Sequence, residues 1–212
     1  MPFLKSITVQ DNINLYIWKI TESSEDLKRD IVLNEHSIER LMVMKSERHR
    51  KGFMSIRKLL MEIGYTDADL YYDEFGKPFL KDGVFISISH SHDFALIALS
   101  DSNIGVDVEI LREKILTVAP RYMNISQLSH LSNQDKVKKA TIIWGIKEAV
   151  FKLKNKNGIS FKQHIKENNF NLSDKKCSVE LQTENEVAHF DIIFEAIENY
   201  YFVCAFEKKK NS

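Results

Sequence analysis

Several features that mark particular classes of protein are scarce or missing in this sequence. Two of the 212 residues are cysteine, Cys177 and Cys204, and they match no metal-binding or redox spacing. Such sparse cysteine use fits a reduced compartment, so we expect a cytoplasmic protein. The N-terminus lacks the apolar core of a signal peptide, and no apolar run reaches the ~20 residues of a membrane span. We therefore expect no membrane partner.

An excess of charge of one sign is also missing. Thirty Lys and Arg side chains balance thirty Asp and Glu side chains, so the formal net charge is zero. No overall field then favours nucleic acid or a membrane surface, and recognition of a charged partner has to be local. The length suits one large domain or two small ones, and a chain of this size buries roughly 70% of its unfolded surface.

Short strands in the middle of the chain carry the first chemical signal. Residues 84–89 and 94–99 are predicted to pair, and a third strand follows at 104–109. Because side chains alternate along a strand, Asp107 and Glu109 share one face. The other face holds apolar side chains and is predicted to be the buried one: Ile104, Val106 and Val108.

Two neighbouring carboxylates repel each other unless a cation lies between them. A hard divalent cation such as Mg²⁺ is the simplest such cation. Taken alone, however, acids two residues apart on a strand are more often a solvated face than a metal site, so a second motif is needed.

That second motif lies on a predicted helix. Ser132 and Asp135 resemble an N-terminal capping box, and Asn157–Gly158 is the predicted end. Trp144, Glu148 and Lys152 are spaced four residues apart, so they share one face of this helix. An indole, a carboxylate and an ammonium on one ridge suit a site for phosphate and metal.

The two motifs together resemble the signatures of the 4'-phosphopantetheinyl transferases, including the gap between them. Residues 75–78, Phe-Gly-Lys-Pro, are similar to that family's Gly-Lys-Pro element, and residues 88–91, Ile-Ser-His-Ser, to its Ser-His-Ser element. The resemblance covers roughly residues 45–155. The length resembles the larger, surfactin-synthetase-activating type and not the short trimeric type.

The resemblance implies a fold that composition alone would describe only as α+β. It implies two similar α+β subdomains with pseudo-twofold symmetry, residues 1–102 and 103–212, and an active site in the cleft between them. It also implies that the protein works as a monomer.

The implied activity is transfer of 4'-phosphopantetheine from coenzyme A to a serine of an apo carrier protein, with release of adenosine 3',5'-bisphosphate. Asp107, Glu109 and Glu148 would hold Mg²⁺, for which Mn²⁺ could substitute. Lys152 would stabilise or protonate the leaving group, and Glu148 would accept the serine proton. The catalytic residues implied are therefore Glu148 and Lys152.

The resemblance also implies a set of contacts to coenzyme A: Arg57, Lys77, Ser89, His90, Lys147 and Lys152. Arginine suits a phosphate because its planar fork binds two oxygens. For Lys77 composition alone favours an ordinary turn, and a lone histidine such as His90 is more often structural. Lys147 is either a phosphate contact or a surface residue.

One position departs from the family pattern. Gln127 stands where a glutamate is common, and glutamine cannot serve as a base. A mechanism that places a general base at this position is therefore in doubt for this chain.

The partner is implied to be an acidic acyl or peptidyl carrier protein. Lysines crowd residues 136–139 and 147–156. They form either a solvated helix face or a docking surface for the carrier. Two other functions remain open, a Mg²⁺-dependent hydrolase of nucleotide pyrophosphates and a non-catalytic module that binds coenzyme A or a carrier.

Overall fold

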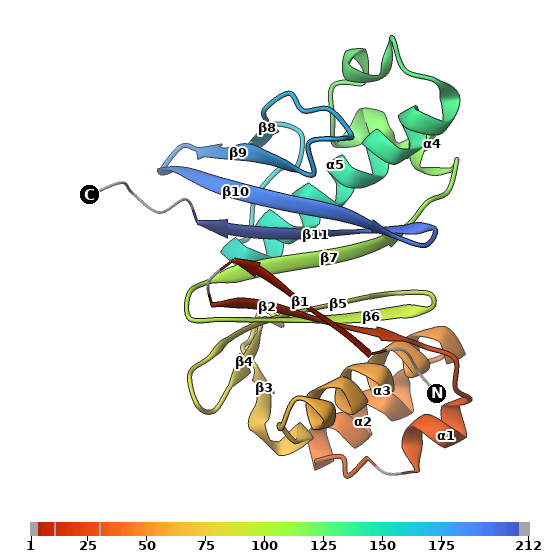
Figure 1. Cartoon of the computed structure of the whole chain (residues 1–212). Helices are drawn as coiled ribbons and strands as arrows, with labels where there is room; N and C mark the ends of the chain where they lie inside the picture. Colours follow the sequence, from red (N-terminus) through yellow and green to blue (C-terminus); the bar gives the residue numbers. More distant parts are fainter. Residues whose placement is uncertain (1–3, 11, 30, 208–212) are drawn as a thin grey trace. The chain divides into compact units, whose positions relative to one another are not determined.

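The computed structural model describes residues 4–10, 12–29 and 31–207. The chain folds as two compact units, Met1–Ser102 and Asn103–Ser212. Each unit combines helices with antiparallel sheet, which confirms the predicted α+β class (Figure 1). We describe each unit by itself.

The first unit is built on a four-stranded antiparallel sheet in the order β1-β2-β6-β5. Its strands confirm those predicted at 84–89 and 94–99 and include two more from the start of the chain. Their bounds are β1 (Leu4–Gln10), β2 (Ile13–Lys19), β5 (Phe85–Ser91) and β6 (Phe94–Ser100).

Three helices accompany this sheet: α1 (Ser24–Lys28), α2 (Glu35–Val43) and α3 (Glu47–Glu62). Helix α3 begins where the Ser46 hydroxyl accepts the His49 N–H. Its apolar side, including Phe53, Ile56 and Leu60, packs with Trp18 of β2 in one buried cluster. The sheet and α3 therefore share the core of this unit.

Residues 70–80, which include the turn at Lys77, form a small hairpin. A 3-10 turn, η1 (Asp67–Asp69), leads into β3 (Leu70–Tyr72), which pairs with β4 (Pro78–Leu80). The connection closes where the Gly76 N–H donates to the Asp73 carbonyl at 3.0 Å, and Gly76 has φ +84°.

The second unit has a five-stranded antiparallel sheet in the order β7-β11-β10-β9-β8. The strands are β7 (Ile104–Ile110), β8 (Ile165–Glu167), β9 (Lys176–Thr183), β10 (Glu186–Ile197) and β11 (Tyr200–Glu207). Short turns α4 (Ile115–Val118), η2 (Ala119–Arg121) and η3 (Ile125–Leu128) follow β7.

Helix α5 (Asn133–Lys154) is the longest helix among the described residues. Its first turn is capped as predicted, because the Asp135 N–H donates to Ser132 Oγ at 3.2 Å. It ends earlier than predicted, because Asn155 adopts the left-handed conformation with φ +47°.

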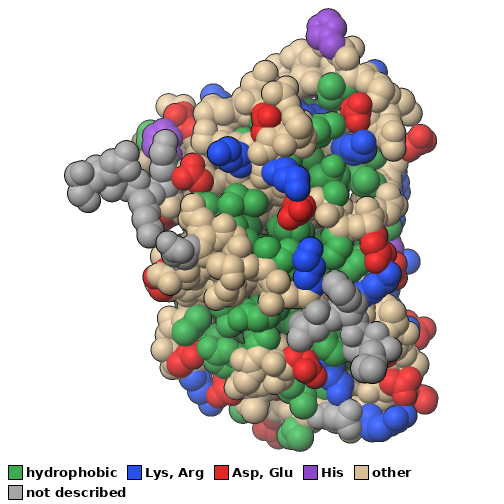
Figure 2. All heavy atoms as spheres, in the orientation of Figure 1, with side chains coloured by type: hydrophobic (Ala, Val, Ile, Leu, Met, Phe, Trp, Pro, Cys, Tyr) green, Lys and Arg blue, Asp and Glu red, His purple; other side chains and the backbone are tan. Residues whose placement is uncertain are grey.

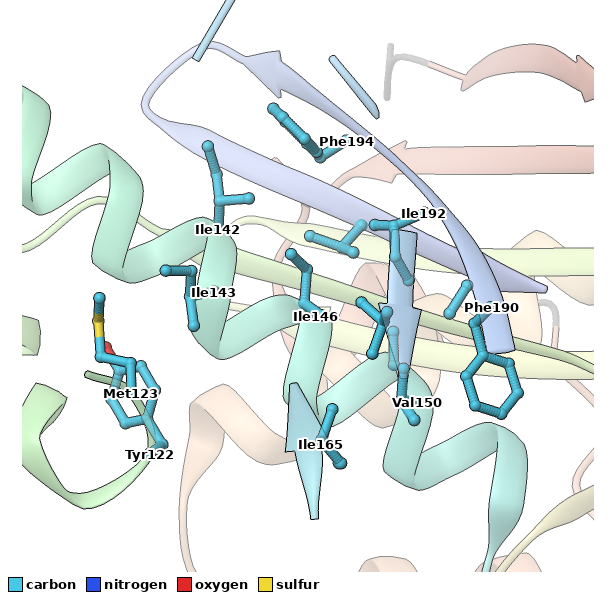
Figure 3. Close-up of a cluster of buried hydrophobic side chains, with 14 of the residues drawn as sticks. Tyr122, Met123, Ile142, Ile143, Ile146, Val150, Ile165, Phe190, Ile192 and Phe194 are labelled. Atoms are coloured by element: carbon cyan, nitrogen blue, oxygen red, sulfur yellow. The ribbon is translucent and has the colours of Figure 1, made fainter. Parts of the chain in front are cut away.

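Helix α5 packs on one face of the sheet. Ile142, Ile143, Ile146 and Val150 of the helix belong to one buried cluster with Phe190 of β10 (Figure 3). All five side chains are fully buried. This core fixes the helix relative to the strands and so fixes the polar residues that the helix carries.

The surface matches the zero net charge. On the face shown in Figure 2, acidic and basic side chains of the described residues are interspersed, with apolar side chains between them. Within the described ranges, no helix combines the length and the apolar character that a membrane crossing needs.

Candidate functional site

The carboxylate-bearing face of β7 is not a solvated face but is covered by α5. Asp107 is only 4% exposed. A Cβ on Gly105 would lie 1.9 Å from the Ala149 carbonyl oxygen, so the helix backbone lies almost directly on the strand there. The prediction that only the Ile104, Val106 and Val108 face is buried was therefore wrong. A strand covered by a helix on its polar side buries both faces.

Close contact between α5 and the sheet brings Lys152 onto Asp107. The Lys152 ammonium donates to Asp107 Oδ1 at 2.7 Å and to the Val106 carbonyl at 3.0 Å. The Lys152 side chain is 29% exposed and that of Asp107 is 5% exposed. A nearly buried carboxylate thus has a cationic partner that solvent still reaches.

Trp144, two turns earlier on the same helix face, reaches the second carboxylate of β7. Its indole Nε1–H donates to Glu109 Oε1 at 3.2 Å. The predicted helix ridge of Trp144, Glu148 and Lys152 therefore meets the predicted pair Asp107 and Glu109 within one unit.

Glu148 lies between these two contacts along the helix. The pKa of its carboxyl is raised from 4.5 to about 7, chiefly by burial and then by the negative charges of Asp107 and Glu109, which the nearby Lys152 opposes. A carboxyl with a pKa near neutrality can exchange a proton at physiological pH.

The donor set fits a hard dication, because three carboxylates supply only oxygen ligands. After burial, the charges of Asp107 and Glu109 help to raise the pKa of Glu148, and a bound cation would relieve this repulsion. Among the described residues, however, no three His, Cys, Asp or Glu side chains already form a metal-ligand group. The three acids are within electrostatic range of one another, and their common metal site stays a prediction.

Lys147 points away from this ridge into the core. Its side chain is 2% exposed, and its ammonium donates to the Ile165 carbonyl and to Glu167 Oε2. Burial lowers the pKa of Lys147, whereas the Glu167 charge opposes that shift. These contacts do not favour the predicted phosphate contact or a surface position.

Glu167 is also the hydrogen-bond partner of Gln127, the residue that departs from the family pattern. Gln127 Nε2 donates to Glu167 Oε1 at 2.9 Å. One carboxylate on β8 thus joins η3 to α5 through Gln127 and Lys147. Sequence reasoning missed Glu167, because it belongs to no motif and lies on a strand of three residues.

The lysine-dense segments are not one solvated face. Lys139 is 4% exposed, donates to the Phe170 carbonyl and lies over the Phe170 ring, with 3.3 Å from its ammonium to the ring centroid. Lys154 forms an ion pair with Glu186. Lys147 and Lys152 are also paired within the unit, and the docking of a carrier by the remaining lysines of these segments stays a prediction.

Arg57, predicted to contact coenzyme A, is built into the core of the first unit. It is 2% exposed, and its Nε donates to Asp67 Oδ1 at 2.9 Å. Its guanidinium also lies 3.5 Å from the Phe53 ring centroid. A guanidinium already neutralised by a buried carboxylate has a structural role, so its phosphate contact stays a prediction that this geometry does not favour.

Of the other predicted contacts in the first unit, Lys77 and His90 lie nearer the surface. The Lys77 backbone N–H donates to Asp73 Oδ1 at 2.8 Å, which holds the turn that composition favoured. His90 is exposed at the end of β5, beside the buried Ser89. The His90 ring lies against α3, where a Cβ on Gly52 would be 2.6 Å from Nδ1. Their contacts with coenzyme A stay predictions.

A pocket of about 220 Å³ opens beside Glu109 in the second unit. Trp144, Thr141 and Ile115 form part of its wall, and the exposed cations Arg112 and Lys114 also line it. The ridge of α5 is therefore reachable from solvent on the Glu109 side.

Known proteins resemble this chain over the part that carries this site. Residues 103–204 match the family model of the 4'-phosphopantetheinyl transferase superfamily. The 4'-phosphopantetheinyl transferase gsp of Aneurinibacillus migulanus is 26% identical over 107 residues, 48% of this chain and 45% of that protein. The transferase Sfp of Bacillus subtilis (strain 168) is 26% identical over 122 residues, 53% of this chain and 54% of Sfp.

A third relative, the 4'-phosphopantetheinyl transferase psf-1 of Bacillus pumilus, is 30% identical over 91 residues, 41% of this chain and 39% of that protein. The chain thus spans about half the length of the curated relatives it matches. Residues 103–204 of this chain are therefore similar to the 4'-phosphopantetheinyl transferase superfamily, and the relatives it matches include gsp and Sfp.

Proposed function

We propose that the protein is a 4'-phosphopantetheinyl transferase. It transfers the 4'-phosphopantetheine group of coenzyme A to a serine of an apo acyl or peptidyl carrier protein and releases adenosine 3',5'-bisphosphate. The observation that carries the proposal is the meeting of the α5 ridge with the carboxylates of β7, through Lys152 on Asp107 and Trp144 on Glu109.

In the proposed reaction the serine oxygen forms a bond to the phosphorus that bears pantetheine. The bond from that phosphorus to the bridging pyrophosphate oxygen breaks, and the electron pair leaves with adenosine 3',5'-bisphosphate. Glu148 takes the serine proton directly or through a water. Lys152 stabilises the charge on the leaving phosphate.

Asp107, Glu109 and Glu148 are the residues that would hold Mg²⁺ or Mn²⁺. When bound, the metal would supply positive charge to the pyrophosphate. A carboxylate that ligates a metal is a weak base. Positioning of the serine therefore contributes more to the rate acceleration than proton abstraction does.

Coenzyme A phosphates are proposed to contact Lys77, Ser89 and His90 in the first unit. An exposed imidazole beside a serine hydroxyl at a strand end offers donors to an anion. We leave Arg57 and Lys147 out of this set, because buried carboxylates already neutralise both.

The carrier protein is proposed to be acidic and to approach the pocket beside Glu109. Arg112 and Lys114 give that pocket local positive charge although the whole chain has none. Charge reversal at Lys114 should raise KM for the carrier and leave KM for coenzyme A unchanged. We further propose that the enzyme acts as a monomer in the cytoplasm, where its two free cysteines would stay reduced.

Intact-protein mass spectrometry tests the function. Apo carriers from fatty-acid, polyketide and peptide synthesis are incubated with coenzyme A, Mg²⁺ and this protein, and at least one should gain the phosphopantetheine mass. A carrier whose acceptor serine is replaced by alanine should gain nothing. The Glu148→Gln variant should lose most of the rate.

The same experiment separates the alternatives. Release of adenosine 3',5'-bisphosphate without a modified carrier would identify a pyrophosphate hydrolase. Binding of coenzyme A or a carrier with neither product would identify a non-catalytic module. Either result overturns the proposed transfer.

A further inference from the structure

Trp144 makes a contact that packing alone does not require. Its indole N–H donates to Glu109 Oε1 at 3.2 Å, from a helix to the neighbouring strand. We propose that Trp144 is a positioning residue, which orients the Glu109 carboxylate for metal binding. This inference rests on the proposed function, because it takes Glu109 as a metal ligand.

The indole can direct a carboxylate because its own orientation is fixed. The Tyr122 ring packs edge-on against Trp144 with centroids 5.1 Å apart, and the Phe161 ring lies 5.6 Å away. Tyr122 is itself held, since its hydroxyl donates to the Ala140 carbonyl at 3.0 Å. Aromatic contacts from two segments therefore aim the N–H at Glu109.

Glu109 needs such a support more than Asp107 does. Glu109 lies near the end of β7 and lines the solvent-accessible pocket, and its side chain has one more rotatable bond than aspartate. A fixed donor on one carboxylate oxygen restricts the rotamers that the side chain samples. Donors that orient metal-binding carboxylates typically change metal affinity by 10- to 100-fold when they are removed.

The chain contains a matched control, since Trp18 is its second tryptophan. Trp18 is 4% exposed, and its Nε1 has no hydrogen-bond acceptor among the described residues. Replacing either tryptophan by phenylalanine removes one indole N–H and keeps an aromatic ring. Only Trp144→Phe removes a hydrogen bond to a carboxylate.

Isothermal titration with Mn²⁺, at saturating coenzyme A, tests the inference. Trp144→Phe should weaken the Kd for Mn²⁺ by 10- to 100-fold, whereas Trp18→Phe should change it less than twofold. Unchanged Mn²⁺ affinity in Trp144→Phe overturns the positioning role and leaves the transferase proposal intact. If the wild-type protein binds no Mn²⁺, both proposals fall.

A second measurement does not depend on the folding of Trp144→Phe. In the Trp18→Phe protein labelled with ¹⁵N at the indole, the one remaining indole resonance reports Trp144. It should move as Mg²⁺ is added with coenzyme A, because the charge on its acceptor changes. A resonance that stays fixed to metal saturation overturns the inference.

Kinetics give a third readout that simple destabilisation would not. Trp144→Phe should raise the Mg²⁺ concentration at half-maximal rate by the same 10- to 100-fold and restore most of kcat at saturating Mg²⁺. A uniform fall in kcat at every Mg²⁺ concentration would instead indicate a structural role only.

Discussion

Gln127 donates a hydrogen bond of 2.9 Å to Glu167, and the same carboxylate accepts a hydrogen bond from the buried ammonium of Lys147. A neutral amide at position 127 therefore suits this chain, because a second carboxylate there would face Glu167 at hydrogen-bond distance. The departure from the pattern that the resemblance implies is compensated by a carboxylate on β8.

Gln127→Glu should destabilise the protein by roughly 1–3 kcal/mol, since two buried carboxylates would share one lysine. Glu167→Gln should cost more, roughly 3–5 kcal/mol, because it leaves Lys147 buried without its counter-charge. Urea unfolding at pH 7.5 measures both. The double variant Gln127→Glu/Glu167→Gln should be more stable than the sum of the single effects predicts, and strict additivity would contradict the coupling.

Gly105→Ala should loosen the contact between α5 and β7. The added Cβ would lie 1.9 Å from the Ala149 carbonyl oxygen, so helix and strand must separate. We expect a loss of roughly 1–3 kcal/mol in the free energy of unfolding, with a larger loss of activity because Glu148 and Lys152 move with the helix. Circular dichroism during urea unfolding and the carrier assay measure the two effects. Unchanged activity would show that the register of α5 on β7 is not needed.

Stability without metal should fall as pH rises through the range in which Glu148 titrates. The pKa of Glu148 is about 7 in the folded protein and 4.5 for an ordinary glutamate, as in the unfolded chain. Between these two pH values the folded protein therefore binds more protons than the unfolded chain. This group therefore lowers the free energy of unfolding from about pH 4.5 to 7, by on the order of 3 kcal/mol in total.

Glu148→Gln removes that titration. In EDTA the variant should be more stable than the wild-type protein at pH 8 and show a shallower dependence of stability on pH between 5 and 7. Urea unfolding at several pH values, with Mg²⁺ added in a parallel series, tests this. Parallel curves for the two proteins would show that Glu148 ionises normally in the folded state.

Arg57 offers a direct test between a structural and a ligand-binding role. Arg57→Met should destabilise the first unit by roughly 3–5 kcal/mol, because Asp67 is left buried and unpaired. The paired variant Arg57→Met/Asp67→Asn should recover much of that loss. If the double variant binds coenzyme A with wild-type Kd in calorimetry, the role is structural. A tenfold or greater loss of affinity in the folded double variant would support the predicted phosphate contact.

Much of the fold and the central residues of the site could be read from local patterns. Alternating apolar residues identified the strands that became β5 and β7, and a short apolar run identified β6. Spacing of four residues placed Trp144, Glu148 and Lys152 on one helix face. These features depend on nearest neighbours along the chain, so the sequence carries them directly.

The tertiary structure alone decided which face of β7 the helix covers and which lysines are buried. Gly105 permits the helix to lie on the carboxylate side of β7. Glu167, 20 residues further along the chain, forms an ion pair with Lys147. No local pattern encodes these pairings, because burial of a charge is decided by partners that only the packed chain brings together.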